Sequence, residues 1–136
     1  MTRYAKQTTV PVSRTKDEIE RTLTRYGAVA FVSGWNENGE AMIGFKMQDR
    51  SVRFIMPSQP ESVLVSERQR AQEERSSWRA LLLLVKAKLE AVDAGFTVFE
   101  EEFLPHIVTD TGETVYERLR EQISGSGGPL QLPANF

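Results

Sequence analysis

The chain has 136 residues, of which 40% are hydrophobic and 26% are charged, the composition of an ordinary globular domain with one core. It contains no cysteine and a single histidine, His106, so disulfide frameworks, thiolate zinc sites and cysteine nucleophiles are excluded. No stretch approaches the roughly 18 apolar residues of a membrane-spanning helix, and the N-terminus lacks the apolar region of a signal peptide. We therefore expect a cytoplasmic protein without membrane contact.

Capping boxes predict where helices begin, because Ser or Thr followed three residues later by Glu or Gln satisfies backbone N–H groups at a helix start. The four pairs are Thr15 with Glu18, Ser66 with Gln69, Thr97 with Glu100, and Thr114 with Glu117. After the first pair, Ile19, Leu23 and Tyr26 recur at helical spacing, and Gly27 ends the pattern. This first helix is expected to lie flat on a sheet.

Three runs of alternating residues predict an antiparallel β-meander. The first covers residues 28–35 and stops at Asn36-Glu37-Asn38-Gly39, where Asn-Gly favours a tight hairpin. Residues 41–47 and 52–56 form the next two strands, with a turn over residues 48–51. Residues 8–13 predict a fourth strand at the edge, where Pro11 is tolerated because its nitrogen cannot donate a hydrogen bond. The predicted order before the long helix is β-α-β-β-β.

Residues 66–94 predict a long helix that carries more apolar surface than one sheet can cover. Its seam repeats at alternating spacings of four and three, as in a coiled coil, through Trp78, Leu82, Val85, Leu89 and Val92. Two neighbouring stripes are also apolar, so we expect one stripe on the sheet and another on the C-terminal helices or on a second subunit. We predict a homo-oligomer whose interface contains Trp78, Leu81, Leu82, Val85 and Leu89. A monomer whose C-terminal helices cover the long helix is the alternative.

The C-terminal part predicts two short helices after Gly95. Phe99 and Phe103 point inward from the first, and Val115, Leu119 and Ile123 place the last on the core. The fold class is therefore α+β: a small antiparallel β-meander packed against a long helix, with short C-terminal helices. A single domain is expected over residues 1–123, and residues 124–136, rich in Gly and Ser, predict a flexible tail.

Charge is unevenly distributed, because residues 89–136 hold nine acidic and two basic side chains while the first two thirds are basic. Such asymmetry is typical of two differently charged solvated faces or of a surface that binds polyanions. The candidate phosphate contacts, on the first helix and the meander, are Arg14, Lys16, Arg21, Arg25, Lys46, Arg50 and Arg53. A pI near 5.5 argues against strong polyanion binding.

Candidate chemical sites are weak. Glu102 and His106 stand four residues apart, but Pro105 interrupts the helix between them and no second histidine or cysteine completes a metal site. The consecutive acids of residues 100–102 point in different directions on a helix, and no glycine-rich phosphate loop is present. We expect no enzyme, no catalytic residue, no metal and no cofactor.

Three stretches resemble a family of small phage and prophage proteins. They are YAKQTTVPVSRTKDEIERTLTRYGA, the meander ending VRFIMP, and WRALLLLVKAKLEAVDAGFTVFEEEFLPHIV, so the resemblance covers nearly the whole chain. It supplies no activity or catalytic residue, but implies a phage context in the cytoplasm of an infected bacterial host.

The resulting hypothesis is a non-enzymatic binding protein associated with nucleic acid or with replication or recombination machinery. The alternative is a host-defence antagonist that, as an oligomer, sequesters a signalling nucleotide or blocks a host protein. A structural or assembly factor with only protein partners is a third option.

Overall fold

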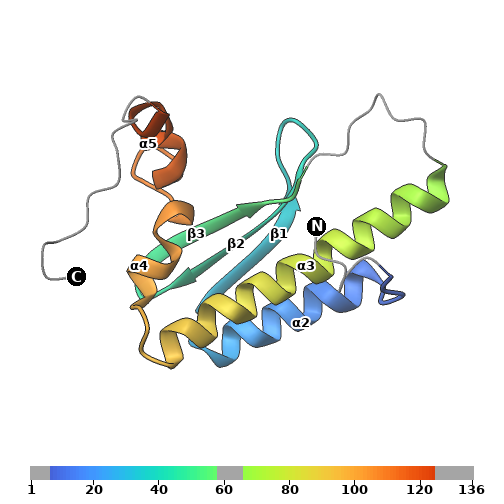
Figure 1. Cartoon of the computed structure of the whole chain (residues 1–136), viewed down its shortest axis with the longest axis horizontal. Helices are drawn as coiled ribbons and strands as arrows, with labels where there is room; N and C mark the ends of the chain where they lie inside the picture. The colour runs from blue at the N-terminus through green and yellow to red at the C-terminus, as the bar shows by residue number, and fades with distance from the viewer. Residues whose placement is uncertain (1–6, 58–65, 125–136) are drawn as a thin grey trace, which may run out of the picture.

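The computed structural model describes residues 7–57 and 66–124 as an α+β fold (Figure 1). Its elements are α2 (Val12–Arg25), β1 (Ala30–Trp35), β2 (Ala41–Met47), β3 (Arg50–Ile55), α3 (Glu67–Asp93), α4 (Phe99–Phe103), the 3-10 helix η1 (Leu104–His106) and α5 (Val115–Ser124). Helices α2 and α3 lie side by side across one face of the sheet. Within the described ranges, no helix has both the length and the apolar character needed to cross a membrane. Apart from Ser124, which ends α5, the predicted tail lies outside the described residues.

The sheet is an antiparallel meander in the order β1-β2-β3, as predicted. Because side chains alternate between the two faces of a sheet, the register sorts them into two sets. The set on the helix side is Phe31, Ser33, Trp35, Ala41, Ile43, Phe45, Met47, Arg50, Val52, Phe54 and Met56. Most of this set belongs to the core, whereas Trp35, at the end of β1, is 80% exposed. The opposite side of the sheet, which α2 and α3 do not cover, is called the open face below.

Helix α2 begins at Val12, directly after Pro11, so the predicted edge strand over residues 8–13 is wrong. Pro11 is extended, with φ −60° and ψ 149°, and leads straight into the helix. The Thr8 carbonyl accepts a hydrogen bond of 2.7 Å from Gln72 Nε2, which ties this segment to α3 rather than to the sheet. The order up to the long helix is therefore α-β-β-β-α.

Two of the predicted capping boxes are formed. Ser66 accepts from the Gln69 amide while the Gln69 side chain accepts from the Ser66 amide, and Ala94 is the C-cap of α3. Thr114 and Glu117 make the same reciprocal pair of bonds at the start of α5.

The other two boxes do not form, because those helices begin elsewhere. Thr15 lies inside α2, where its hydroxyl donates to the Pro11 carbonyl at 3.4 Å. Helix α4 begins after Val98, and the Thr97 hydroxyl instead donates to the Glu101 carboxylate at 2.8 Å.

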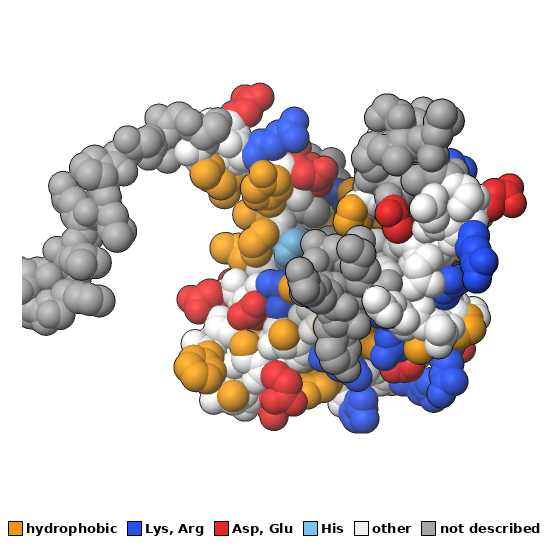
Figure 2. Space-filling model, turned by 45° about the vertical axis from the view of Figure 1, so that its right-hand side comes forward, with side chains coloured by type: hydrophobic (Ala, Val, Ile, Leu, Met, Phe, Trp, Pro, Cys, Tyr) orange, Lys and Arg blue, Asp and Glu red, His pale blue; other side chains and the backbone are white. Residues whose placement is uncertain are grey.

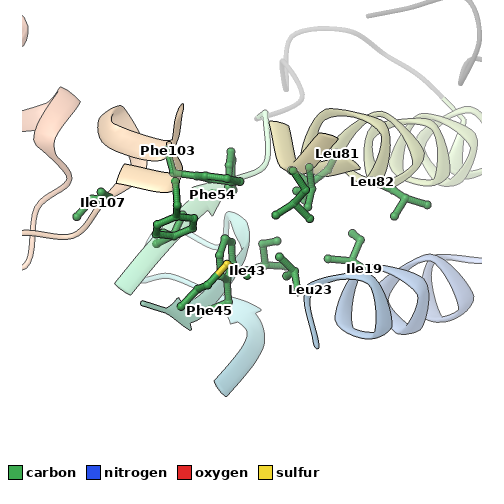
Figure 3. Close-up of a cluster of buried hydrophobic side chains, with 14 of the residues drawn as sticks. Ile19, Leu23, Ile43, Phe45, Phe54, Leu81, Leu82, Phe103 and Ile107 are labelled. Carbon is green, nitrogen blue, oxygen red and sulfur yellow. The ribbon is translucent and has the colours of Figure 1, made fainter. Parts of the chain in front are cut away.

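The apolar seam of α3 is buried by other parts of the same chain. It packs between α2 and the sheet, as the close-up of the core shows for Leu81 and Leu82 beside Ile19 and Leu23 (Figure 3). The five predicted interface residues, Trp78, Leu81, Leu82, Val85 and Leu89, are between 0% and 7% exposed. The prediction that they form an oligomer interface is therefore corrected: they are core residues of one protomer and offer no surface to a second copy.

Phe103 packs the C-terminal part of the chain against the sheet. It is fully buried and meets Phe45 and Phe54 edge-on, with ring centroids 5.8 Å and 6.4 Å away, while Phe99 stacks on it at 4.9 Å (Figure 3). The chain then runs beside β3, where the Val108 amide donates to the Ser51 carbonyl at 2.8 Å.

Helix α5 differs from the prediction that it rests on the core with three residues. Only Val115 packs against the core, whereas Leu119 is 39% exposed and Ile123 is exposed too. The helix stands away from α2 and α3, beyond α4 (Figure 1). An apolar stripe of α5 is thus left on the surface.

The β2–β3 turn stores backbone strain, because Gln48 and Asp49 have φ angles of 50° and 62°. Positive φ at both positions is typical of a two-residue hairpin turn that prefers Asn-Gly. We expect Asp49→Gly to raise the free energy of unfolding by about 0.5–1 kcal/mol, measured by chemical denaturation. Asn38→Gly is the matched control in the other hairpin, where the positive φ belongs to Gly39, and should not stabilise. Equal effects of the two variants would contradict the strain argument.

Candidate functional site

Toward β1 the open face carries small and apolar residues, and it also carries two cations. The register arranges it in three rows across the sheet: Ala30, Lys46 and Ser51; Val32, Gly44 and Arg53; Gly34, Met42 and Ile55. Val32 is 60% exposed and Ile55 is 42% exposed. Large apolar side chains that point to solvent from one sheet face are typical of a surface that meets a partner.

Gly44 hollows the centre of this face. A Cβ atom built on Gly44 would lie 3.2 Å from Val32 Cγ1, so any larger residue would press on its neighbour. A shallow cavity of about 370 Å³ lies here, with Lys46 and Arg53 among its lining residues and Val108 at its β3 side.

A second cavity, of about 470 Å³, lies between β3 and the start of α5. It is lined by Arg53, Ile55, Pro105, His106, Thr114, Tyr116 and Glu117. Tyr116 is 55% exposed, and the His106 ring stacks on Phe54 with centroids 4.2 Å apart. Figure 2 shows hydrophobic side chains gathered beside the histidine. Arg53 lines both cavities, so the open face continues into the wall made by η1 and α5.

Arg53 holds this wall in place. Its Nη1 donates to the Gly112 carbonyl at 3.0 Å and its Nη2 to Glu117 Oε1 at 2.8 Å. The same Glu117 oxygen accepts the Thr114 amide at 2.8 Å, so one carboxylate both caps α5 and binds β3. The pKa of Glu117 is lowered first by that amide, then by the Thr114 hydroxyl and Arg53, against a rise from burial. Arg53 Nε is buried and has no hydrogen-bond partner among the described residues.

The seven cations predicted to contact phosphate do not share one surface. Arg14, Lys16, Arg21 and Arg25 belong to α2 in the helical layer, Lys46 and Arg53 to the open face, and Arg50 to the start of β3. Arg50 Nε donates to Glu100 Oε2 at 2.9 Å, and Lys16 Nζ lies 4.9 Å from the centre of the buried Trp78 ring. The acidic C-terminal third therefore neutralises both arginines of the meander.

Trp35, an aromatic ring on which a nucleic-acid base could stack, is not on the open face but belongs to the helix-side set at the end of β1. Lys46 shares the open face with Met42 and Ile55.

Several cations lie where α2 and α3 meet, interspersed with acids. Arg79 donates to Glu18 at 2.9 Å, and this bond is the first cause of the lowered pKa of Glu18; the charges of Arg79, Lys86 and Arg14 lower it further. Arg21 and Arg25 are exposed on the same helix. A groove of about 530 Å³ between the helices is lined by Arg25 and Lys86, with Glu90 and Asp93 also on its wall.

Polar groups of the open face and of its wall form hydrogen bonds with one another. Arg53, Glu117 and Thr114 form one network, and within the part of the chain that the structure describes no group of three acidic, His or Cys side chains could hold a metal. Glu102 binds Lys88, with Nζ to Oε2 at 3.1 Å, instead of sharing a ligand with His106. The sequence does not predict that Val32, His106 and Tyr116 line these cavities. The wall made by η1 and α5 comes close to the sheet only because the chain runs beside β3 before α5 begins.

Comparison of the chain with models of known protein families, with curated proteins and with solved structures finds no match in any of the three.

The pKa of His106 measures how far the wall buries this ring. Burial first, and then the charge of Lys88, lower its pKa below the ordinary 6.5, so the ring is neutral at pH 7. Since the chain has one histidine, its NMR signal needs no assignment. We expect a titration midpoint below 6.5 that rises in Lys88→Met. Because the unfolded chain takes up the proton first, this group's contribution to stability is present above pH 6.5 and lost as pH falls toward the folded midpoint. A midpoint at or above 6.5 in the wild type would contradict the burial of this ring.

Proposed function

We propose that this protein is a non-enzymatic binding protein that recognises a protein partner with the open face and the exposed stripe of α5. The observation that carries the proposal is that two apolar surfaces, Val32 with Ile55 and Tyr116 with Leu119, flank a pair of cavities joined by Arg53. Arg53 spans β3 and α5, so the two surfaces are held in a fixed relation.

A protein partner fits this surface better than a nucleic acid does. The open face presents aliphatic side chains rather than the aromatic rings on which bases stack, and Arg53 is neutralised by Glu117. A surface that combines exposed aliphatic side chains with charged and polar groups is typical of protein interfaces. In the phage context that the resemblance implies, the partner is a component of replication or recombination machinery or a host protein that is blocked.

The nucleotide-sequestering form of the host-defence hypothesis requires an oligomer, and the interface residues predicted for it on α3 are buried inside one protomer. A blocked host protein remains compatible with the open face.

Photocrosslinking tests the protein-binding proposal. A photoreactive amino acid at Ile55 or at Tyr116 should crosslink the same foreign protein in an extract of the cells that make this chain, whereas one at the exposed Thr24 of α2 should not. Ile55→Glu with Tyr116→Glu should weaken capture by about tenfold or more, since buried charge opposes docking. Lys86→Glu, on the other layer, is the matched control and should bind normally. Crosslinks from position 24 with none from position 55 would place the partner on the helices instead.

Nucleic-acid binding is a second candidate, because α2 and α3 bring Arg14, Arg79 and Lys86 around Glu18, and Arg21 and Arg25 extend this charge along α2. If about four phosphates are contacted, affinity for short DNA should fall roughly 10²-fold between 50 and 200 mM salt. Fluorescence anisotropy measures this fall. Arg21→Glu with Arg25→Glu should abolish binding while Lys46→Glu should leave it intact, and the reverse ranking would move the contact to the open face.

A further inference from the structure

Among the described residues, nothing pairs with the outer edge of the sheet that β1 forms. On the opposite edge, beside β3, Ile107 forms a bridge with Val52 and the Val108 amide bonds to the Ser51 carbonyl. β1 pairs only with β2, and no described residue donates a hydrogen bond to its outer side or accepts one from it.

The ladder shows which backbone groups face outward. The Asn36 amide donates to the Glu40 carbonyl at 3.0 Å, so this pair is hydrogen-bonded. Hydrogen-bonded and non-hydrogen-bonded pairs alternate along antiparallel strands, so Gly34 and Val32 also bond to β2. The N–H and C=O groups of Phe31, Ser33 and Trp35 therefore point away from the sheet.

Nothing in β1 protects this edge. Natural edge strands carry charged residues, prolines or bulges that prevent further pairing. Between Ala30 and Trp35 the strand has neither a charge nor a proline, and its six residues pair with β2 in unbroken register.

We infer that β1 pairs antiparallel with β1 of a second copy, about a two-fold axis at Ser33, to form a dimer with one continuous sheet. In this register Ser33 meets Ser33, and Phe31 of each copy lies opposite Trp35 of the other. All outward N–H and C=O groups of these residues then find partners, and a two-fold axis closes the assembly.

The strand is complementary to itself in shape and charge. Val32 lies opposite Gly34 of the second copy, where a Cβ built on the glycine meets nothing within 4 Å. Trp35, which is 80% exposed, gains the Phe31 ring as a neighbour. Glu37, the first charge after β1, falls opposite Val29, so no like charges meet along the pair. These features favour a second copy over a foreign strand.

Pairing would also extend the open face across both copies. The row of Arg53, Gly44 and Val32 continues into Gly34, Met42 and Ile55 of the second copy, all on the same side of the sheet. Each copy thus contributes residues to the other's binding surface. The inference concerns the purified protein alone, so its test does not depend on the proposed partner.

Disulfide trapping tests the register in a chain that has no cysteine of its own. Position 32 and position 34 of the second copy form a non-hydrogen-bonded pair with Cα atoms about 4.5 Å apart, within disulfide range. A mixture of Val32→Cys and Gly34→Cys should crosslink under mild oxidation. Either variant alone should not, because identical positions lie roughly 7–8 Å apart on the diagonal.

Substitution of Ser33 tests the role of the backbone. Ser33→Pro removes an outward N–H without touching a bond to β2 and should raise the dimer dissociation constant about tenfold or more, measured by analytical ultracentrifugation. Ser33→Ala keeps the N–H and should remain dimeric. The Ser33 hydroxyl is buried and has no hydrogen-bond partner among the described residues, so its loss is tolerated. A wild-type protein that stays monomeric at high concentration, or a dimer that the mixed cysteine variants fail to trap, overturns the inference whether or not Ser33→Pro folds.

Discussion

Burial of the α3 seam against α2 and one face of the sheet is the interaction on which the rest of the structure depends. Trp78, Leu82 and Val85 are almost fully buried, and each such side chain contributes roughly 1.5–3 kcal/mol gross when it leaves water. A meander of three short strands cannot bury both faces with one layer of helices. Because α2 and α3 occupy the same side, the opposite side is left to α5, which covers only its β3 margin. The open face is thus a consequence of where the seam packs.

Electrostatics then fixes how the C-terminal part meets the sheet. Three ion pairs join the basic first two thirds of the chain to its acidic last third: Arg53 with Glu117, Arg50 with Glu100, and Lys88 with Glu102. Much of the charge asymmetry is therefore satisfied inside the protomer. These groups are partly exposed, so each pair adds little stability. Their effect is to orient the C-terminal part of the chain relative to the sheet. The lowered pKa of Glu117 means that its contribution is present above the ordinary carboxyl pKa and lost as pH falls through the folded value.

Local signals in the sequence predicted the three strands and the long helix well, because hairpin turns and the Ser66 cap act over a few residues. Tertiary contacts decided the rest. A hydrogen bond from Gln72 to Thr8 holds residues 8–11 along α3, and Leu119 points to solvent although its spacing matches a core position. Periodicity cannot tell a seam buried by its own chain from one buried by a second copy, so the pattern predicts an oligomer interface for residues that are in the core.

The open face and the β1 edge support the proposed partner more strongly than any motif in the chain does. An apolar sheet face and an uncharged edge strand both carry an aggregation risk when they remain in water. Self-pairing of β1 removes the edge but leaves the face, and in fact enlarges it, since the rows of one copy continue into the next. A protein that closed its edge in this way would present a broad, two-fold symmetric surface with Arg53 near each end. The partner best suited to such a surface is itself symmetric or binds as two copies, because only then does each half of the surface meet the same contacts.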